Sequence, residues 1–317
     1  MARPAGREGP GEAGRTQGMK QHETERRMKI GTHGAWCNTS VLSTEQLREL
    51  AQRVEALGYS ALWYPESRDG HEAYSLAAFL LCHSEKLIVA TGIANIYARD
   101  STAARQGQHT LAKISGGRFL LGLGVSHVPM VEGIRGHTYG KPVATMRAYL
   151  EGMEKAAAIA PPLDAPPPVV LAALGPHMTR LGAGRTAGIL PYNVTPEHTA
   201  WARELIGAGP WLCVEQMVVL ETDPVNARRV ARQNLSHYMA LPHYVNNWLR
   251  LGFSEAEMAD GGSDRFVDAI VAWGDAAALQ ARVQAHFAAG ADHVCVQPLN
   301  PDGSRLPDWA ALEALAP

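Results

Sequence analysis

The sequence predicts a (β/α)8 barrel, and three observations support that prediction. From Met28 onward, short apolar segments rich in β-branched residues alternate with longer amphipathic segments, a pattern typical of repeated βα units. The apolar segments contain few polar residues, as expected for parallel strands covered on both faces. The pattern repeats eight times, and eight parallel strands close a barrel. An open, doubly wound parallel sheet is the alternative that this pattern leaves.

Eight segments are expected to form the strands. Each is short and apolar, and each is bounded by turn-forming or helix-capping residues. In chain order they are Met28–Thr32, Ala61–Tyr64, Leu87–Thr91, Phe119–Leu123, Val169–Ala173, Gly188–Leu190, Val214–Leu220 and His293–Gln297.

The intervening segments carry helix signals. Ser43 and Gln46 have the spacing of a capping box, an apolar stripe follows them, and Gly58 is suited to end that helix. Several later helices are expected to open with proline, whose fixed φ suits a first helical turn. They begin at Pro142, Pro176, Pro196 and Pro224.

A single domain is expected from residue 28 to residue 317. The segment between strands seven and eight is longer than one crossover helix, so Leu241–Gly262 is predicted to be a helical insertion over one rim of the barrel. Residues 1–27 contain no Val, Ile, Leu or Phe, and we expect them to be a disordered leader.

The composition of the 317 residues excludes several classes of partner. Hydrophobic residues make up 46% and charged residues 19%, the balance of a globular protein. With 29 Lys and Arg against 31 Asp and Glu, the chain has no basic excess for nucleic acid or an anionic membrane. Its longest apolar stretch, Ala73–Cys82, is much shorter than the roughly 20 residues of a membrane helix. We therefore expect a small-molecule substrate, with neither nucleic acid nor membrane as a partner.

The cysteines indicate neither a metal cluster nor a disulfide framework. All four are far apart in the sequence, and none forms a Cys-x-x-Cys pair. This pattern fits a reducing cytoplasm, and no metal site is predicted.

Candidate functional residues follow the strands, because ligands of such barrels lie at the carboxyl ends. His33 follows the first expected strand, Glu66 the second and His127 the fourth. Glycines follow strands three, four and five, where they would let a planar ligand lie close to the backbone. These glycines are Gly92, Gly124 and Gly175.

The segment Gly175-Pro176-His177-Met178 opens a helix whose free amides could bind a phosphate. Together with the glycines at the other strand ends, this segment predicts a site for a phosphorylated planar cofactor. The alternative is that these glycines form ordinary turns and that the helix is merely capped.

Four segments resemble the luciferase-like monooxygenase superfamily, in its branch of oxidoreductases that depend on the deazaflavin coenzyme F420. They are Thr91–Ile96 with Arg99, the run from Ser115-Gly116-Gly117-Arg118-Phe119 to Ser126, Leu174–Pro176, and Ala289–Val294. The resemblance implies a (β/α)8 barrel with a late insertion and a deazaflavin, or alternatively FMN, in its mouth. It also implies a non-prolyl cis peptide at Gly92–Ile93 and a homodimer. The cofactor contacts that it implies are Gly92, Ile93, Ala94, Asn95, Val125, Ser126, Leu174, Gly175, Pro176, His177 and Met178.

The catalytic group departs from the family pattern. Sugar-phosphate and alcohol dehydrogenases of this superfamily carry an Asp-His pair after strand two, and the former a Glu after strand four; here Glu66-Ser67 and His127 stand at those places. Because histidine titrates near neutral pH, His127 is the first candidate for moving a proton, followed by Glu66 and His33. His137 and His243 are expected to be structural or surface residues.

Three functions remain open from the sequence. The first is hydride transfer between coenzyme F420 and a small organic substrate, and the second is an FMN-dependent monooxygenase. The third is a barrel that binds a flavin or deazaflavin without catalysis. A dense group of aromatic and polar residues between His237 and Trp248 is either a substrate lid or part of a dimer surface. Trp36, Trp63 and Tyr64 either wall the pocket or belong to the core.

Overall fold

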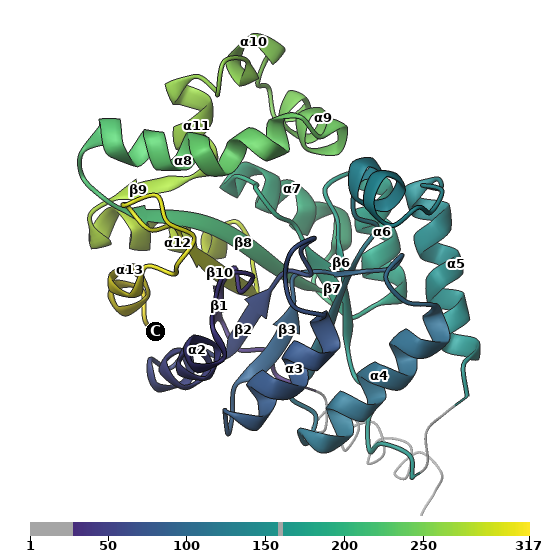
Figure 1. Ribbon diagram of the computed structural model, residues 1–317. Coiled ribbons are helices and arrows are strands. Elements are labelled where there is room, and N and C mark those ends of the chain that lie inside the picture. The colour runs from purple at the N-terminus through teal and green to yellow at the C-terminus, as the bar shows by residue number, and fades with distance from the viewer. Residues whose placement is uncertain (1–27, 158–160) are drawn as a thin grey trace, which may run out of the picture.

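The computed structural model describes residues 28–157 and 161–317, so the leader predicted for residues 1–27 lies outside the described residues. Eight parallel strands close into a barrel surrounded by helices (Figure 1). The predicted (β/α)8 fold is confirmed. The open-sheet alternative is wrong, because β10 (His293–Pro298) pairs with both β1 (His33–Trp36) and β8 (Trp211–Leu220).

The remaining elements follow the predicted order. The other barrel strands are β2 (Ala61–Tyr64), β3 (Ile88–Thr91), β5 (Phe119–Gly124), β6 (Val169–Ala172) and β7 (Gly188–Leu190). Two short strands were not predicted: β4 (Ala94–Asn95) pairs with β5, and β9 (Ala272–Gly274) pairs with the end of β8. The helices between them are α2 (Thr44–Ala56), α3 (Ala73–Cys82), α4 (Ser101–Ile114), η1 (Pro129–Ile134), α5 (Pro142–Lys155), α6 (Pro176–Arg185), α7 (Pro196–Ile206), α12 (Ala276–Ala288) and α13 (Trp309–Ala314).

The first strand differs from its prediction. Met28–Thr32 is not a strand, and β1 begins at His33 instead. Gly31 has a φ of +73°, which interrupts extended backbone, and Ile30 is buried against the side chains that fill the barrel interior. This segment is therefore apolar because it closes the amino end of the barrel.

Alternate residues of the strands fill that interior. Trp63 of β2 donates a hydrogen bond from Nε1 to Nε2 of His293 on β10, at 2.9 Å across the lumen. A Cβ at Gly34 would lie 2.4 Å from the same imidazole nitrogen, so β1 needs glycine at this position. Trp63 is thus a core residue, and Tyr64 is also fully buried.

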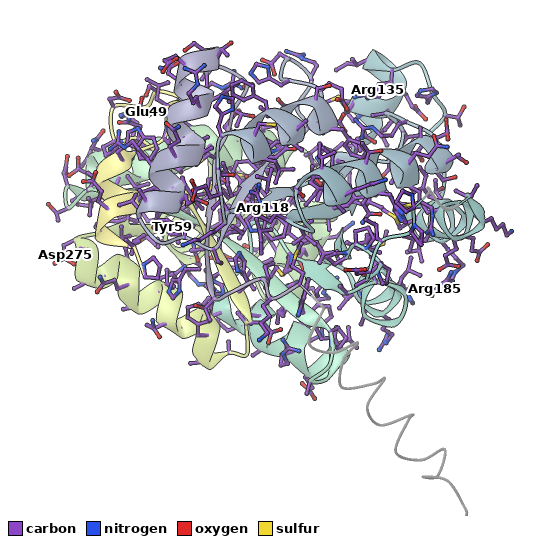
Figure 2. All side chains as sticks on the ribbon, turned by 90° about the horizontal axis from the view of Figure 1, so that it is seen from below. Glu49, Tyr59, Arg118, Arg135, Arg185 and Asp275 are labelled. Carbon is purple, nitrogen blue, oxygen red and sulfur yellow. The ribbon has the colours of Figure 1, made fainter. Side chains whose placement is uncertain are left out.

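Local signals explain the outer elements. Ser43 and Gln46 form the predicted capping box of α2, each side chain bonding to the other residue's amide. The turn before β5 uses Gly116 and Gly117 at positive φ, and the guanidinium of Arg118 then donates to backbone carbonyls, including those of Leu81 and Leu87. Arg118 lies in the middle of the molecule in Figure 2, whereas Arg185 and Asp275 lie at its periphery. Arg118 therefore has a structural role, because it joins the backbone segments that precede β3 and β5 at the amino-terminal side of the barrel.

The predicted insertion is present between the seventh and eighth barrel strands. It is wider than Leu241–Gly262, because α8 (Pro224–Met239), α9 (Pro242–Arg250), α10 (Glu255–Met258) and α11 (Asp264–Ile270) share one hydrophobic cluster. These four helices lie together at the top of Figure 1, above β8 and β9. No helix in the described part of the chain is long and apolar enough to cross a membrane.

Candidate active site

The carboxyl ends of the strands bring together most of the residues predicted to bind a cofactor. Gly92–Asn95 follow β3 and form β4, Val125 and Ser126 follow β5, and Leu174–Met178 link β6 to α6. The peptide bond between Gly92 and Ile93 is cis, as predicted. Ser126 adopts a φ of +57°, and Tyr139 donates a hydrogen bond to its carbonyl.

The glycines at these ends do not all leave room for a ligand. A Cβ at Gly92 would lie 2.6 Å from Nε1 of Trp36, and a Cβ at Gly124 would lie 2.5 Å from the side chain of Ile93. The prediction that glycine at these strand ends leaves room for a planar ligand is therefore wrong for Gly92 and Gly124, because neighbouring side chains fill the space where a Cβ would lie. Gly175 differs, because the nearest heavy atom to its Cβ position is Nη1 of Arg250 at 3.8 Å.

The N-terminus of α6 is arranged to receive an anion. Gly175 is its N-cap residue and supplies no side-chain cap, and Pro176 occupies the first turn. The amides of His177 and Met178 therefore lie at the positive end of the helix without a carbonyl of that helix to bond. Arg250 of α9 brings a guanidinium to this end, where it donates a 2.7 Å hydrogen bond to the carbonyl of Leu174.

Polar side chains around this helix end lack partners. Among the described residues, five buried side chains in this region have an atom without a hydrogen bond: Thr179, Asn193, His198, Glu215 and Asn247. Nε2 of His198 contacts the same Leu174 carbonyl at 3.2 Å, and Arg250 bonds to Oδ1 of Asn247. Because buried polar groups are normally satisfied, these atoms offer hydrogen-bonding capacity to any group bound there.

His127 lies at the same mouth, in the loop after β5. Its ring stacks on that of His243 of α9, with centroids 4.6 Å apart and planes inclined by 8°, and His237 of α8 lies edge-on at 6.4 Å. Burial, and then these two imidazoles, lower the pKa of His127 to about 3. The imidazole is therefore neutral at pH 7, so it can accept a hydrogen bond but cannot act as an acid. His243, expected to be structural or a surface residue, is thus an immediate neighbour of the first candidate for catalysis.

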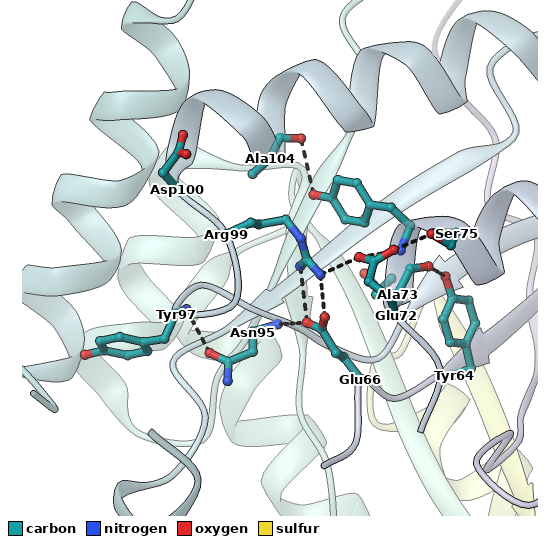
Figure 3. Close-up of polar contacts among 12 residues, drawn as sticks. Tyr64, Glu66, Glu72, Ala73, Ser75, Asn95, Tyr97, Arg99, Asp100 and Ala104 are labelled. Carbon is teal, nitrogen blue, oxygen red and sulfur yellow. Dashed lines mark hydrogen bonds and ion pairs between the residues drawn. The ribbon is translucent and has the colours of Figure 1, made fainter. Parts of the chain in front are cut away.

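Glu66 is held in an ion pair (Figure 3). Its carboxylate accepts two bonds from the guanidinium of Arg99 and a 2.8 Å bond from the amide of Asn95. Arg99 also bonds to Glu72 at 2.7 Å, and Glu72 caps α3 by accepting from Tyr74 and Ser75. A carboxylate held by so many donors fixes the loops after β2 and β4. A surface hollow of about 280 Å³ lies beside this pair.

His33 is not at the mouth. It was predicted to follow the first strand, but it is the first residue of β1 and therefore lies at the amino end of the barrel. Its ring packs on Phe287 of α12, with centroids 5.1 Å apart. The predicted position was wrong because the strand itself begins five residues later than expected.

Tyr192, Asn193 and Gln297 of the mouth were not predicted, whereas Tyr238 and Trp248 belong to the group expected to form a substrate lid or a dimer surface. Tyr238 of α8 donates to the hydroxyl of Tyr192 at 3.1 Å, and Tyr192 donates to Oε1 of Gln297 at 2.8 Å. The rings of Tyr192 and Trp36 lie 5.5 Å apart across the barrel. Trp248 of α9 donates to the carbonyl of Asn193 at 3.0 Å. The aromatic part of the insertion thus packs onto the barrel mouth.

The family follows from comparison with known proteins. The sequence matches the profile of the luciferase-like monooxygenase family over residues 28–293. The chain belongs to this family. A protein of Mycobacterium tuberculosis named as a coenzyme F420-dependent oxidoreductase is 28% identical over 213 residues, which cover 57% of this chain and 60% of that protein. The match thus spans less than two thirds of that relative.

Solved structures share the fold of this luciferase-like barrel. The coenzyme F420-dependent tetrahydromethanopterin reductase of Methanopyrus kandleri has a TM-score of 0.72 at 15% identity, covering 91% of this chain and 98% of that one. The oxygenating constituent of 3,6-diketocamphane monooxygenase from Pseudomonas putida, solved in complex with FMN, has a TM-score of 0.66 at 15% identity, covering 91% and 97%.

Proposed function

We propose that this protein is a coenzyme F420-dependent oxidoreductase that transfers a hydride between the deazaflavin and a small organic substrate. The observation that carries the proposal is the uncapped N-terminus of α6 beside Arg250, which suits a phosphate. The name of the mycobacterial relative supports the choice of deazaflavin.

The residues of the mouth fit such a cofactor. The amides of His177 and Met178 and the guanidinium of Arg250 would hold its phosphate, and the unpaired amide nitrogen of Asn247 offers a further hydrogen bond. Gly92–Asn95, Val125 and Ser126 would contact its ring system. When bound, a deazaflavin supplies or accepts a hydride, because a carbon replaces the reactive ring nitrogen of a flavin.

His127 would contact the substrate as a neutral imidazole. With a pKa of about 3 it would stay uncharged at pH 7 and accept a hydrogen bond from the substrate. The side chains of Tyr238 and Tyr244 would cover the substrate from the insertion and exclude water. The homodimer and the cytoplasmic location remain predictions from the family resemblance and from the cysteine pattern.

Equilibrium titration separates the deazaflavin from FMN. We expect coenzyme F420 to quench intrinsic tryptophan fluorescence with a dissociation constant at least ten times lower than that of FMN. Tighter binding of FMN would instead favour the FMN-dependent monooxygenase, which the Pseudomonas structure keeps as the second candidate. Binding of either cofactor without turnover of any substrate would favour a non-catalytic carrier.

A further inference from the structure

Glu215 is a buried carboxyl in the middle of an apolar strand. It belongs to β8 and is only 1% exposed. Placing a carboxylate in such surroundings is costly unless a cation or several donors compensate its charge. The contacts of Glu215 therefore decide what form it takes.

Its position in the strand directs it into the barrel. Cys213, two residues earlier on β8, belongs to the cluster that fills the interior, and strand residues two apart share a face. Glu215 therefore also faces the lumen, one layer of side chains nearer the carboxyl end of the barrel than Cys213. In the closed order of strands, β8 lies four places from β3 in either direction, so Glu215 is across the mouth from Gly92 and Ile93.

Only one oxygen of this carboxyl has a partner. Oε2 accepts a 3.1 Å hydrogen bond from the amide of Asn193, whereas Oε1 has no partner among the described residues. The side chain of Asn193 is itself unpaired at both polar atoms. Two adjacent buried side chains thus hold hydrogen-bonding capacity that the protein leaves unused.

The surroundings of Glu215 contain no compensating cation in the part of the chain that the structure describes. The titratable groups that interact with it are Tyr192 at the end of β7, Tyr238 of α8, Tyr244 of α9 and Cys295 of β10. Burial outweighs the bond from Asn193 and raises the pKa of Glu215 to about 8. At pH 7 the carboxyl therefore holds its proton.

We propose that Glu215 is the general acid of this barrel and that it donates a proton from its unpaired oxygen to the substrate. The inference rests on the proposed function. In the reducing direction the carbonyl carbon gains a hydride, the π electrons of the C=O bond move to oxygen, and that oxygen takes the proton of Glu215. The product is an alcohol, the carboxyl becomes a carboxylate, and the reduced deazaflavin is oxidised by two electrons. His127, which is neutral at pH 7, cannot fill this role.

The same surroundings define the class of substrate. Only uncharged groups form the hydrogen-bonded series of Tyr238, Tyr192 and Gln297. The unpaired side-chain amide of Asn193 is also uncharged. A carboxylate or phosphate beside Glu215 would meet no cation from these groups and would be desolvated at a high cost. The site therefore fits an uncharged carbonyl or imine compound, whose heteroatom accepts a hydrogen bond.

Infrared difference spectroscopy tests this assignment without depending on turnover. The spectrum of the wild-type protein minus that of Glu215→Gln should show the C=O stretch of a protonated carboxyl at pH 7. Acetone, as a small uncharged ketone, should shift this band to lower frequency in protein loaded with cofactor. Glu255→Gln is the matched control, because Glu255 is exposed on α10 and its replacement should leave the carboxyl band of Glu215 in place.

Kinetics gives the second measurement. Glu215→Gln should reduce ketones about 100-fold more slowly than the wild type, within the usual range for a lost general acid, with an unchanged dissociation constant for the cofactor. Glu215→Asp keeps a titratable proton and should recover part of the rate. A missing carboxyl band at pH 7, a band that acetone leaves unshifted, or full turnover by Glu215→Gln would overturn the inference. Failure of the proposed function is distinct from these results, because the wild type would then bind FMN more tightly than coenzyme F420 or would turn over no substrate with either cofactor.

Discussion

Two buried glutamates at the same end of the barrel have opposite surroundings. The Glu66 side chain is 5% exposed and receives a guanidinium and a backbone amide, so its charge is compensated. Glu215 is as deeply buried but receives one amide and no cation from the described residues, and an oxygen remains unpaired. The comparison shows that the donors around a buried carboxyl, rather than its burial, decide whether it fastens loops together or stores a proton.

The ion pair also explains why Glu66 matters to the site without reacting there. Its bond to the amide of Asn95 holds β4, which follows the cis peptide, and Arg99 connects it to the capping residue of α3. We therefore interpret Glu66 as a residue that positions the cofactor segment. Two changes test the comparison most sharply. One removes the guanidinium that compensates the charge of Glu66, and the other removes the proton of Glu215.

Arg99→Ala should have the largest effect. It leaves Glu66 as a buried carboxylate with only one amide donor, and breaking such a pair costs about 3 to 5 kcal/mol of unfolding free energy. Urea denaturation at pH 7 measures this loss. The control is Arg305→Ala, whose 3.5 Å pair with Asp69 is half-exposed and should contribute less than about 1 kcal/mol. Equal losses for the two variants would contradict the account.

The stability contributed by Glu215 should depend on pH in the opposite sense to that of a paired carboxylate. Its pKa is raised in the folded state, so its contribution is complete below the ordinary value of 4.5 and is lost as the pH rises through about 8. Relative to Glu215→Gln, the wild type should lose on the order of 3 kcal/mol between pH 4.5 and pH 9. Denaturation curves of both proteins across this range provide the measurement. A difference that does not change with pH would show that Glu215 does not titrate in this window.

Glu66→Gln should be intermediate. The amide keeps the shape of the side chain but removes the charge that faces Arg99, and we expect a loss of about 2 kcal/mol at pH 7 because Glu72 still pairs with the guanidinium. Glu215→Gln should instead be more stable than the wild type at the same pH, because at pH 7 the wild-type carboxyl must take up a proton on folding and glutamine does not. Comparing the urea midpoints of these two variants tests the contrast directly, and a larger loss in Glu215→Gln would reverse it.

His127→Asn should affect turnover and leave stability nearly unchanged. Asparagine cannot place an acceptor atom where the imidazole nitrogen lies, so the hydrogen bond to the substrate is lost, and we expect turnover to fall about tenfold with unchanged cofactor affinity. Steady-state kinetics and a cofactor titration check the two parts separately. His177→Asn is a suitable control, because that side chain is exposed and only its amide is assigned to the site. Unchanged turnover in His127→Asn would remove the imidazole from the mechanism.

The fold was largely predictable because it depends on a repeating pattern. Alternating strands and helices, capping boxes and prolines at helix starts are local, and each was found close to its predicted place. The first strand was missed because Gly34 and Ala35 do not resemble a strand; Gly34 is small because a Cβ there would meet His293 and Trp63 of the two neighbouring strands. A segment selected for packing around a neighbour carries little local signal of its own.

The site was predictable only in part. The strand ends that carry Gly92, Val125 and Gly175 follow from the topology, but the partners of each side chain do not. Arg99 is next to Asp100 in the sequence, yet it pairs with Glu66, which is 33 residues away, and Asp100 caps α4 instead. Glu215 did leave a signal in the sequence, because a carboxyl in a central apolar strand is unusual. The lack of a partner for its second oxygen could not be predicted, because the groups around that oxygen come from other elements of the fold.

The location of the bound cofactor is the most direct test of the account. A crystal structure of the protein with coenzyme F420 should place the phosphate within hydrogen-bond distance of the His177 and Met178 amides and of Arg250. Its ring system should lie between the Gly92–Ile93 segment and the Glu215 side of the mouth. A deazaflavin bound in the hollow beside Glu66 and Arg99, or at the amino end near His33, would contradict the account.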